Sequence, residues 1–144
     1  MEKVSVAFTV SSTNYEVPLG FSVLYNNGTV VDIDYIDKQK TVAFDLEIED
    51  GAQQLNFVMK NKTVDHTVID ESNNIISDAC LTINDVTIEN VDLGYNFIKH
   101  SVYTHNFNGT QDSIKDSFHG TMGCNGTVTF EFSSPFYIWL LENF

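Results

Sequence analysis

The chain has 144 residues and a formal net charge of −13, with 20 acidic residues against seven basic ones, all of them lysine. This length is typical of one domain, which we expect to span residues 1–144. A protein that neutralises phosphate groups needs a basic face, so the charge balance argues against a nucleic-acid partner and against docking on anionic lipid. No apolar run has the length of a signal peptide or a membrane span, so we expect no membrane insertion.

The composition favours strands over helices. Val, Ile and Thr far outnumber Ala and Leu, and branched side chains suit a pleated sheet. Asn is abundant, and it tolerates turn conformations that most residues avoid. The sequence therefore predicts an all-β protein with many short turns.

Apolar and polar residues alternate with period two through the first half of the chain. Val4, Val6, Phe8 and Val10 share one face of the first predicted strand. A strand through Phe21–Tyr25 meets Asn26-Asn27-Gly28, a sequence typical of a hairpin turn because Asn and Gly accept positive φ.

The centre of the chain continues the alternation. Val31, Ile33 and Tyr35 share one face, and Val42, Phe44, Leu46 and Ile48 share another. Glu49-Asp50-Gly51 predicts a turn into a strand that holds Leu55, Phe57 and Met59. This pattern predicts a meander with one buried face and one wet, acidic face.

The pattern breaks at residues 60–78, which we interpret as a decorated loop around a short extended piece. Strands resume at Leu81 and Ile83 and again at Val86 and Ile88, and the phase slip at Asn84-Asp85 indicates a turn or a bulge.

The C-terminal third begins with a strand on which Tyr103, His105 and Phe107 share one face. A loop is expected from Asn108 to Asn125, and the next strand buries Val128, Phe130 and Phe132. Ser133-Ser134-Pro135 can cap a short helix from Phe136 to Glu142, with Pro at the first helical position. A terminal strand is the alternative for that segment.

Eight to ten short strands in a chain of this size predict a two-layer antiparallel β-sandwich. A jelly-roll-like arrangement with a short C-terminal helix is the expected form.

Catalytic patterns are sparse. No Gly-x-Ser-x-Gly occurs, and the four histidines lack the helical i, i+4 spacing of a zinc site. Acidic residues spaced two apart, as in Asp32/Asp34 and Asp45/Glu47/Glu49, are typical of a solvated sheet face. We therefore expect a protein without catalytic activity. A small glycoside hydrolase, which needs two carboxylates across a cleft, is the third hypothesis. Cys80 and Cys124 are expected to be reduced rather than paired.

An acidic segment between Asp65 and Asp78 is the best candidate for a cation site. Calcium prefers six to eight oxygen ligands, and Asp65, Asp70, Glu71 and Asp78 offer carboxylates, with amides from Asn73 and Asn74. The spacing does not match an EF-hand loop. An Asx-type turn around residues 71–74, without metal, is the alternative.

Aromatic residues crowd the C-terminal half. Sugars present C–H faces that stack on aromatic rings, while polar side chains bond their hydroxyl groups. Tyr95, Tyr103, His105 and Phe107 are the candidate glycan-binding residues. The alternative is that these rings belong to the core.

Three segments carry a resemblance to a known family: NFVMKNKTVDHTVIDESNNIISDACLTINDVTIENVDLG, YTHNF and GTMGCNGTVTFEFSSPFYIWLLENF. Over about the C-terminal two-thirds the chain resembles an uncharacterised family of small proteins of marine tailed bacteriophages and ocean metagenomes. The expected shape is also similar to carbohydrate-binding modules, including calcium-dependent ones that read xylan-type glycans. No sugar-binding motif of those modules matches residue by residue.

The function that we expect is therefore a non-catalytic carbohydrate-binding module, with calcium as the candidate cofactor and a glycan as the partner. The main alternative is a phage structural protein that assembles with other virion subunits or with itself. The expected location is cytoplasmic or virion-associated.

Overall fold

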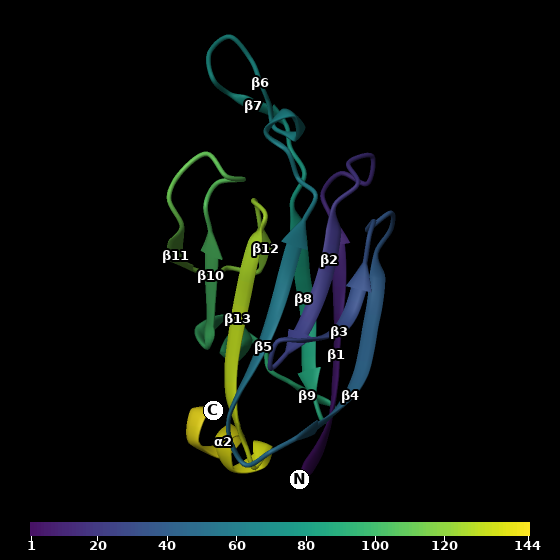
Figure 1. Cartoon of the computed structure of the whole chain (residues 1–144), viewed down its shortest axis with the longest axis vertical. Helices are drawn as coiled ribbons and strands as arrows, with labels where there is room; N and C mark the ends of the chain where they lie inside the picture. The colour runs from purple at the N-terminus through teal and green to yellow at the C-terminus, as the bar shows by residue number, and fades with distance from the viewer.

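The computed structural model describes all 144 residues, and it consists of two antiparallel sheets packed face to face with a small hairpin at one end (Figure 1). The five-stranded sheet has the order β12–β8–β1–β4, with β9 also paired to β8. Its bounds are β1 Glu2–Ser12, β4 Lys40–Ile48, β8 Leu81–Ile88, β9 Val91–Asp92 and β12 Thr121–Met122.

The six-stranded sheet has the order β11–β10–β13–β5–β2–β3. Its bounds are β2 Gly20–Tyr25, β3 Gly28–Ile33, β5 Gly51–Lys60, β10 Ser101–His105, β11 Ile114–Ser117 and β13 Gly126–Ser134. The other elements are the 3₁₀ turn η1 Val64–His66, the hairpin strands β6 Val68–Ile69 and β7 Ile75–Ser77, and the helices α1 Tyr95–Lys99 and α2 Phe136–Asn143. The predicted two-layer antiparallel sandwich and its short C-terminal helix are confirmed.

A single core of 29 buried apolar residues fills the space between the sheets. Phe8 of β1 contacts the rings of Phe21 and Phe57 in the opposite sheet, with centroids 5.8 and 5.3 Å apart. The inward face that period two predicted for β1 is fully buried. Because inward residues alternate with outward ones, most polar residues of the strands lie on the two outer faces, although a few, such as Gln53, Ser101 and His105, are buried.

The predicted hairpin at Asn26-Asn27-Gly28 is confirmed, since β2 pairs with β3 there and both asparagines have positive φ. The slip at Asn84-Asp85 is also confirmed as an irregularity, because the register of β8 on β1 shifts there and Asp85 has a φ of 57°.

The predicted central meander is wrong. β4 lies in the five-stranded sheet, paired with β1, whereas β5 lies in the other sheet and pairs with β2. The chain crosses between the sheets at the turn before Gly51, whose φ is 98°. Alternation sets which face of a strand is buried, but it does not set which strand lies beside it.

The loop predicted from Asn108 to Asn125 contains two strands, so that prediction is wrong in part. β11 pairs with β10 at the edge of the six-stranded sheet, and β12 pairs with β8. All four residues of β11 are exposed, so this edge strand has no alternation by which the sequence could reveal it.

The predicted serine cap of α2 is also wrong. Pro135 precedes the helix and no side chain of the Ser-Ser-Pro segment caps it. Instead the carboxylate of Glu2 accepts bonds from the backbone N–H of Phe136 (3.0 Å) and the hydroxyl of Ser134 (2.7 Å). An acidic group at a helix N-terminus is favourable, and here it ties α2 to β1 across the bottom of the sandwich.

Replacing Phe57 tests the aromatic contact between the sheets. We expect Phe57→Ala to lower the free energy of unfolding by about 3–5 kcal/mol, because the variant leaves a cavity against Phe8, Phe21 and Phe97. Urea denaturation measures this change. Phe144→Ala, at an exposed position, is the matched control and should change stability little. Similar losses in the two variants would contradict the assignment of Phe57 to the core.

Candidate functional site

Three of the four predicted glycan-binding residues come together near the end of β10. The ring of Tyr103 lies 4.5 Å from that of His105, which lies 4.7 Å from that of Phe107. Tyr103 and His105 are only 7% and 8% exposed, because β10 is an inner strand of its sheet and directs them into the sandwich. Burial raises the pKa of Tyr103, whose hydroxyl donates to the carbonyl of Cys124. Rings that are buried and packed against one another in this way offer little face to a sugar.

Tyr95, the fourth predicted residue, lies apart from this group. It is the first residue of α1, is 73% exposed and contacts no other aromatic ring. The four residues therefore do not form one exposed platform. Tyr95 is exposed, Phe107 is half-buried, and Tyr103 and His105 are buried.

The acidic residues predicted to bind calcium are also dispersed. Asp70 lies in the turn of the β6–β7 hairpin, where one carboxylate oxygen accepts the backbone N–H groups of Ser72 and Asn74 at 2.9 Å each. The Asn74 bond is the largest of the effects that lower the pKa of Asp70. Asp65 lies in η1 and Glu71 is exposed in the hairpin turn. The Asx-type turn that we considered as the alternative is present, with Asp70 as its acceptor.

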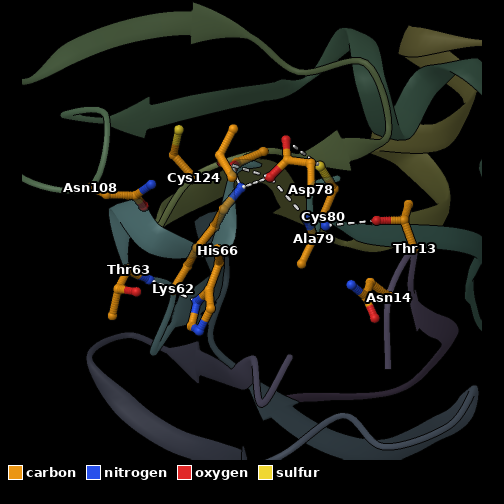
Figure 2. Close-up of polar contacts among 12 residues, drawn as sticks. Thr13, Asn14, Lys62, Thr63, His66, Asp78, Ala79, Cys80, Asn108 and Cys124 are labelled. Atoms are coloured by element: carbon orange, nitrogen blue, oxygen red, sulfur yellow. Dashed lines mark hydrogen bonds and ion pairs between the residues drawn. The ribbon is translucent and has the colours of Figure 1, made fainter. Parts of the chain in front are cut away.

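Asp78 lies at the base of the hairpin and forms an ion pair with the buried side chain of Lys62 (Figure 2). The ammonium of Lys62 donates to Asp78 Oδ1 and to the carbonyl of Gly123, both at 2.6 Å. The Lys62 side chain is 1% exposed. Burial raises the pKa of Asp78, but bonds from Lys62, Thr67 and the backbone of Ala79 outweigh this effect and leave it below its usual value.

The same place joins the hairpin to the rest of the sandwich. The side chain of Asn125 accepts from the backbone N–H of Lys62 at 2.9 Å and donates to its carbonyl at 2.7 Å. The side chain of Asn108 accepts from the backbone N–H of Asn125 at 2.8 Å. Cys80 and Cys124, both free thiols, lie on either side of the Lys62–Asp78 pair (Figure 2). Asn125 is thus a structural residue that fixes the position of Lys62.

These contacts do not fit a calcium ion held by the predicted residues. Calcium requires several oxygen ligands directed at one point. Asp70 is committed to its turn and Asp78 to Lys62, and no group of three or more His, Cys, Asp or Glu gathers anywhere in the chain. The ammonium supplies the positive charge that the Asp78 carboxylate needs.

A groove that the sequence did not reveal lies on the outer face of the six-stranded sheet. Two cavities of about 500 and 410 Å³ share the side chains of Gln54, His100 and Glu131. The larger cavity reaches Trp139 and Asn143 of α2, and the smaller one reaches β10 and β11. We call the two together the outer-face groove.

Strand register aligns the polar side chains of the outer-face groove. Gln54 of β5 lies opposite Glu131 of β13, and Asn56 lies opposite Thr129. The Thr129 hydroxyl donates to the Asn56 side-chain oxygen at 2.7 Å. Outward residues of neighbouring strands thus form rows of hydrogen-bonding groups across the sheet.

His100 marks the junction of the two cavities. Its ring lies 5.2 Å from that of Trp139, and its Nε2 atom is buried without a hydrogen-bond partner. Burial, and to a smaller degree the charge of Lys99, lowers the pKa of His100, so the imidazole is mostly neutral at pH 7. A neutral imidazole can donate a hydrogen bond to a hydroxyl group or accept one from it. The sequence did not single out these residues as a site, because only the order of the strands shows which of them adjoin.

Comparison with known proteins places the fold beside carbohydrate-binding modules. No family model and no curated protein matches the chain. The selenomethionine form of vCBM60, from work linking two families of calcium-dependent carbohydrate-binding modules by circular permutation, matches at 11% identity with a TM-score of 0.58, covering 88% of this chain and 89% of that one. A structure of vCBM60 in complex with galactobiose matches at 12% identity with a TM-score of 0.54, covering 88% and 96%. At this identity the likeness establishes the shared β-sandwich fold alone.

No helix in the structure combines the length and apolar character needed to cross a membrane.

The Lys62–Asp78 ion pair can be tested with a chelator and one substitution. We expect a chelator to leave the Tm of the wild-type protein unchanged, because Lys62 holds Asp78. Lys62→Met should lower the free energy of unfolding by about 3 kcal/mol, since removing one partner leaves a carboxylate without its counter-charge.

The control is Lys38→Met, at an exposed lysine without an ion pair, which should unfold like the wild type. A Tm that falls by several degrees on chelation alone would contradict the assignment, because it would reveal a bound metal that contributes to stability.

Proposed function

We propose that this protein is a non-catalytic carbohydrate-binding protein that holds a glycan in the outer-face groove. The observation that supports this proposal is the set of aligned amide, hydroxyl, carboxylate and imidazole groups around Gln54, His100 and Glu131. Such groups bond sugar hydroxyls, and Trp139, which lines one end of the groove, adds an apolar contact. The sandwich fold shared with carbohydrate-binding modules is consistent with this function.

The groove favours binding over hydrolysis. Glu131 is the only carboxylate among its lining residues. Glycoside hydrolysis by the common mechanisms requires two carboxylic groups on either side of the scissile bond. The hydrolase hypothesis therefore has no support from the composition of this groove.

The proposed binding does not use calcium at the predicted residues. The vCBM60 neighbour belongs to work on calcium-dependent modules. In this chain, the Asp78 carboxylate is paired with the ammonium of Lys62. We therefore propose that glycan binding persists in the presence of a chelator.

The alternative function, assembly with other virion subunits or with itself, is supported by the β6–β7 hairpin. This hairpin extends beyond the sandwich (Figure 1), and its aliphatic side chains Ile69, Ile75 and Ile76 are more than half exposed. Exposed apolar clusters are typical of interaction sites. Sedimentation velocity over a range of protein concentrations tests assembly of the chain with itself, which requires oligomers whose population Ile75→Ser should reduce. The phage origin and the virion-associated location stay predictions from the sequence.

A glycan array, run with calcium and again with a chelator, tests the proposed function. We expect binding to a defined class of sugar in both buffers. Isothermal titration with an oligosaccharide of that class should then give a Kd about tenfold weaker or more for Glu131→Gln, because a hydrogen bond to a charged group contributes about 1.5–3 kcal/mol.

The matched control is Glu47→Gln, on the outer face of the opposite sheet, which should leave the Kd unchanged. Tyr95→Ala separates the groove from the predicted aromatic site. Loss of binding in Tyr95→Ala together with wild-type affinity in Glu131→Gln would move the site to α1. No binding to any glycan by a folded sample would contradict the proposed function.

A further inference from the structure

The lysines of this chain are distributed unevenly. Four of the seven form ion pairs with aspartates, namely Lys3, Lys40, Lys60 and Lys62. The remaining three, Lys38, Lys99 and Lys115, have no acidic partner within 4 Å, although the chain carries 20 acidic residues. Two of these three line the same cavity.

Lys99 and Lys115 border the smaller cavity of the outer-face groove from two elements. Lys99 ends α1, directly before His100, and Lys115 lies on edge strand β11 opposite Thr104 of β10. The positions arise from separate parts of the chain, and the fold brings both to one volume of about 410 Å³.

The anionic groups near this cavity do not neutralise both lysines. Glu131 is the only carboxylate that lines it, and one Glu131 oxygen lies 3.4 Å from the side-chain nitrogen of Gln54. Among the side chains that line this cavity, two cations therefore stand against one anion, in a protein of net charge −13.

We infer that the glycan held in this groove is acidic, with its carboxylate or sulfate group at the end formed by Lys99 and Lys115. This inference rests on the proposed function and names its ligand class. An anion there completes the pairing of the two lysines, while the sugar hydroxyls reach Gln54, His100 and Glu131. Carboxylate and sulfate present the same chemistry to an ammonium group, so the ligand is defined by its negative charge.

The net charge of −13 does not prevent the protein from binding an acidic glycan. Charges separated by more than about 8 Å are largely screened at physiological salt, so the distant acidic residues repel the ligand only weakly at contact. Two lysines are too few for a polyanion such as a nucleic acid, whose binding needs a basic face. An oligosaccharide that places one acidic group in the site balances the excess of one positive charge that the two lysines and Glu131 leave.

Isothermal titration with three related probes tests the inference: galactobiose, digalacturonate and galactobiose 4-sulfate. At 50 mM NaCl we expect one or both acidic probes to bind at least tenfold more tightly than galactobiose, and we expect the difference to shrink at 500 mM NaCl. Lys99→Gln and Lys115→Gln should each weaken the acidic probes several-fold more than they weaken galactobiose. Lys38→Gln, at the unpaired lysine outside the groove, is the matched control.

The outcomes identify the acidic group and separate the inference of an acidic ligand from the proposed glycan-binding function. Preference for digalacturonate alone identifies a carboxylate, preference for the sulfated probe alone identifies a sulfate, and preference for both leaves charge as the selected feature. Equal affinity for all three probes, with no effect of Lys99→Gln or Lys115→Gln, overturns the acidic ligand but keeps the glycan-binding function. Absence of binding to every probe and to the glycan array, by a folded sample, overturns both.

Discussion

The packing of aromatic rings between the two sheets is the contact on which the rest of the molecule depends. Phe8 crosses the interior to Phe21 and Phe57, and this contact fixes the faces of β1, β2 and β5. Once the inward faces are fixed, period two directs every second residue outward. The groove is therefore a consequence of the core, since the strands that bury Phe57 and Phe130 present Gln54 and Glu131 on their other side.

Local patterns were sufficient to predict the sandwich, most of its strands and its C-terminal helix. The alternation around Val4 and Phe8 predicts a buried face from a handful of neighbouring residues, and Asn26-Asn27 predicts its own turn. Pairing between distant strands has no such local signal. β4 and β5 follow one another in sequence yet lie in different sheets, and β11 is exposed on every residue, so neither arrangement could be predicted from alternation.

The same limit explains the candidate site. Tyr103 and Tyr95 are equally suited to stacking on a sugar by residue type. Only the structure shows that Tyr103 lies on the buried face of β10, whereas Tyr95 begins α1 and is exposed. Lys62 could not be chosen as a buried cation, because its partners Asp78 and Gly123 lie 16 and 61 residues away. Sequence spacing predicts contacts along one strand or helix, whereas these sites join three or more segments.

The two groups of lysines have opposite roles in one acidic chain. Lys62 is enclosed, and its two short hydrogen bonds hold the hairpin base to the loop at Gly123, so its charge contributes to structure and is not available to a ligand. Lys99 and Lys115 are exposed beside a cavity and have no acidic partner, so their charge is available. An exposed ammonium that already bonds a carboxylate gains little from a second anion, whereas an unpaired one gains a full charge-assisted bond. The two unpaired cations therefore lie on the face whose polar groups the core has already aligned.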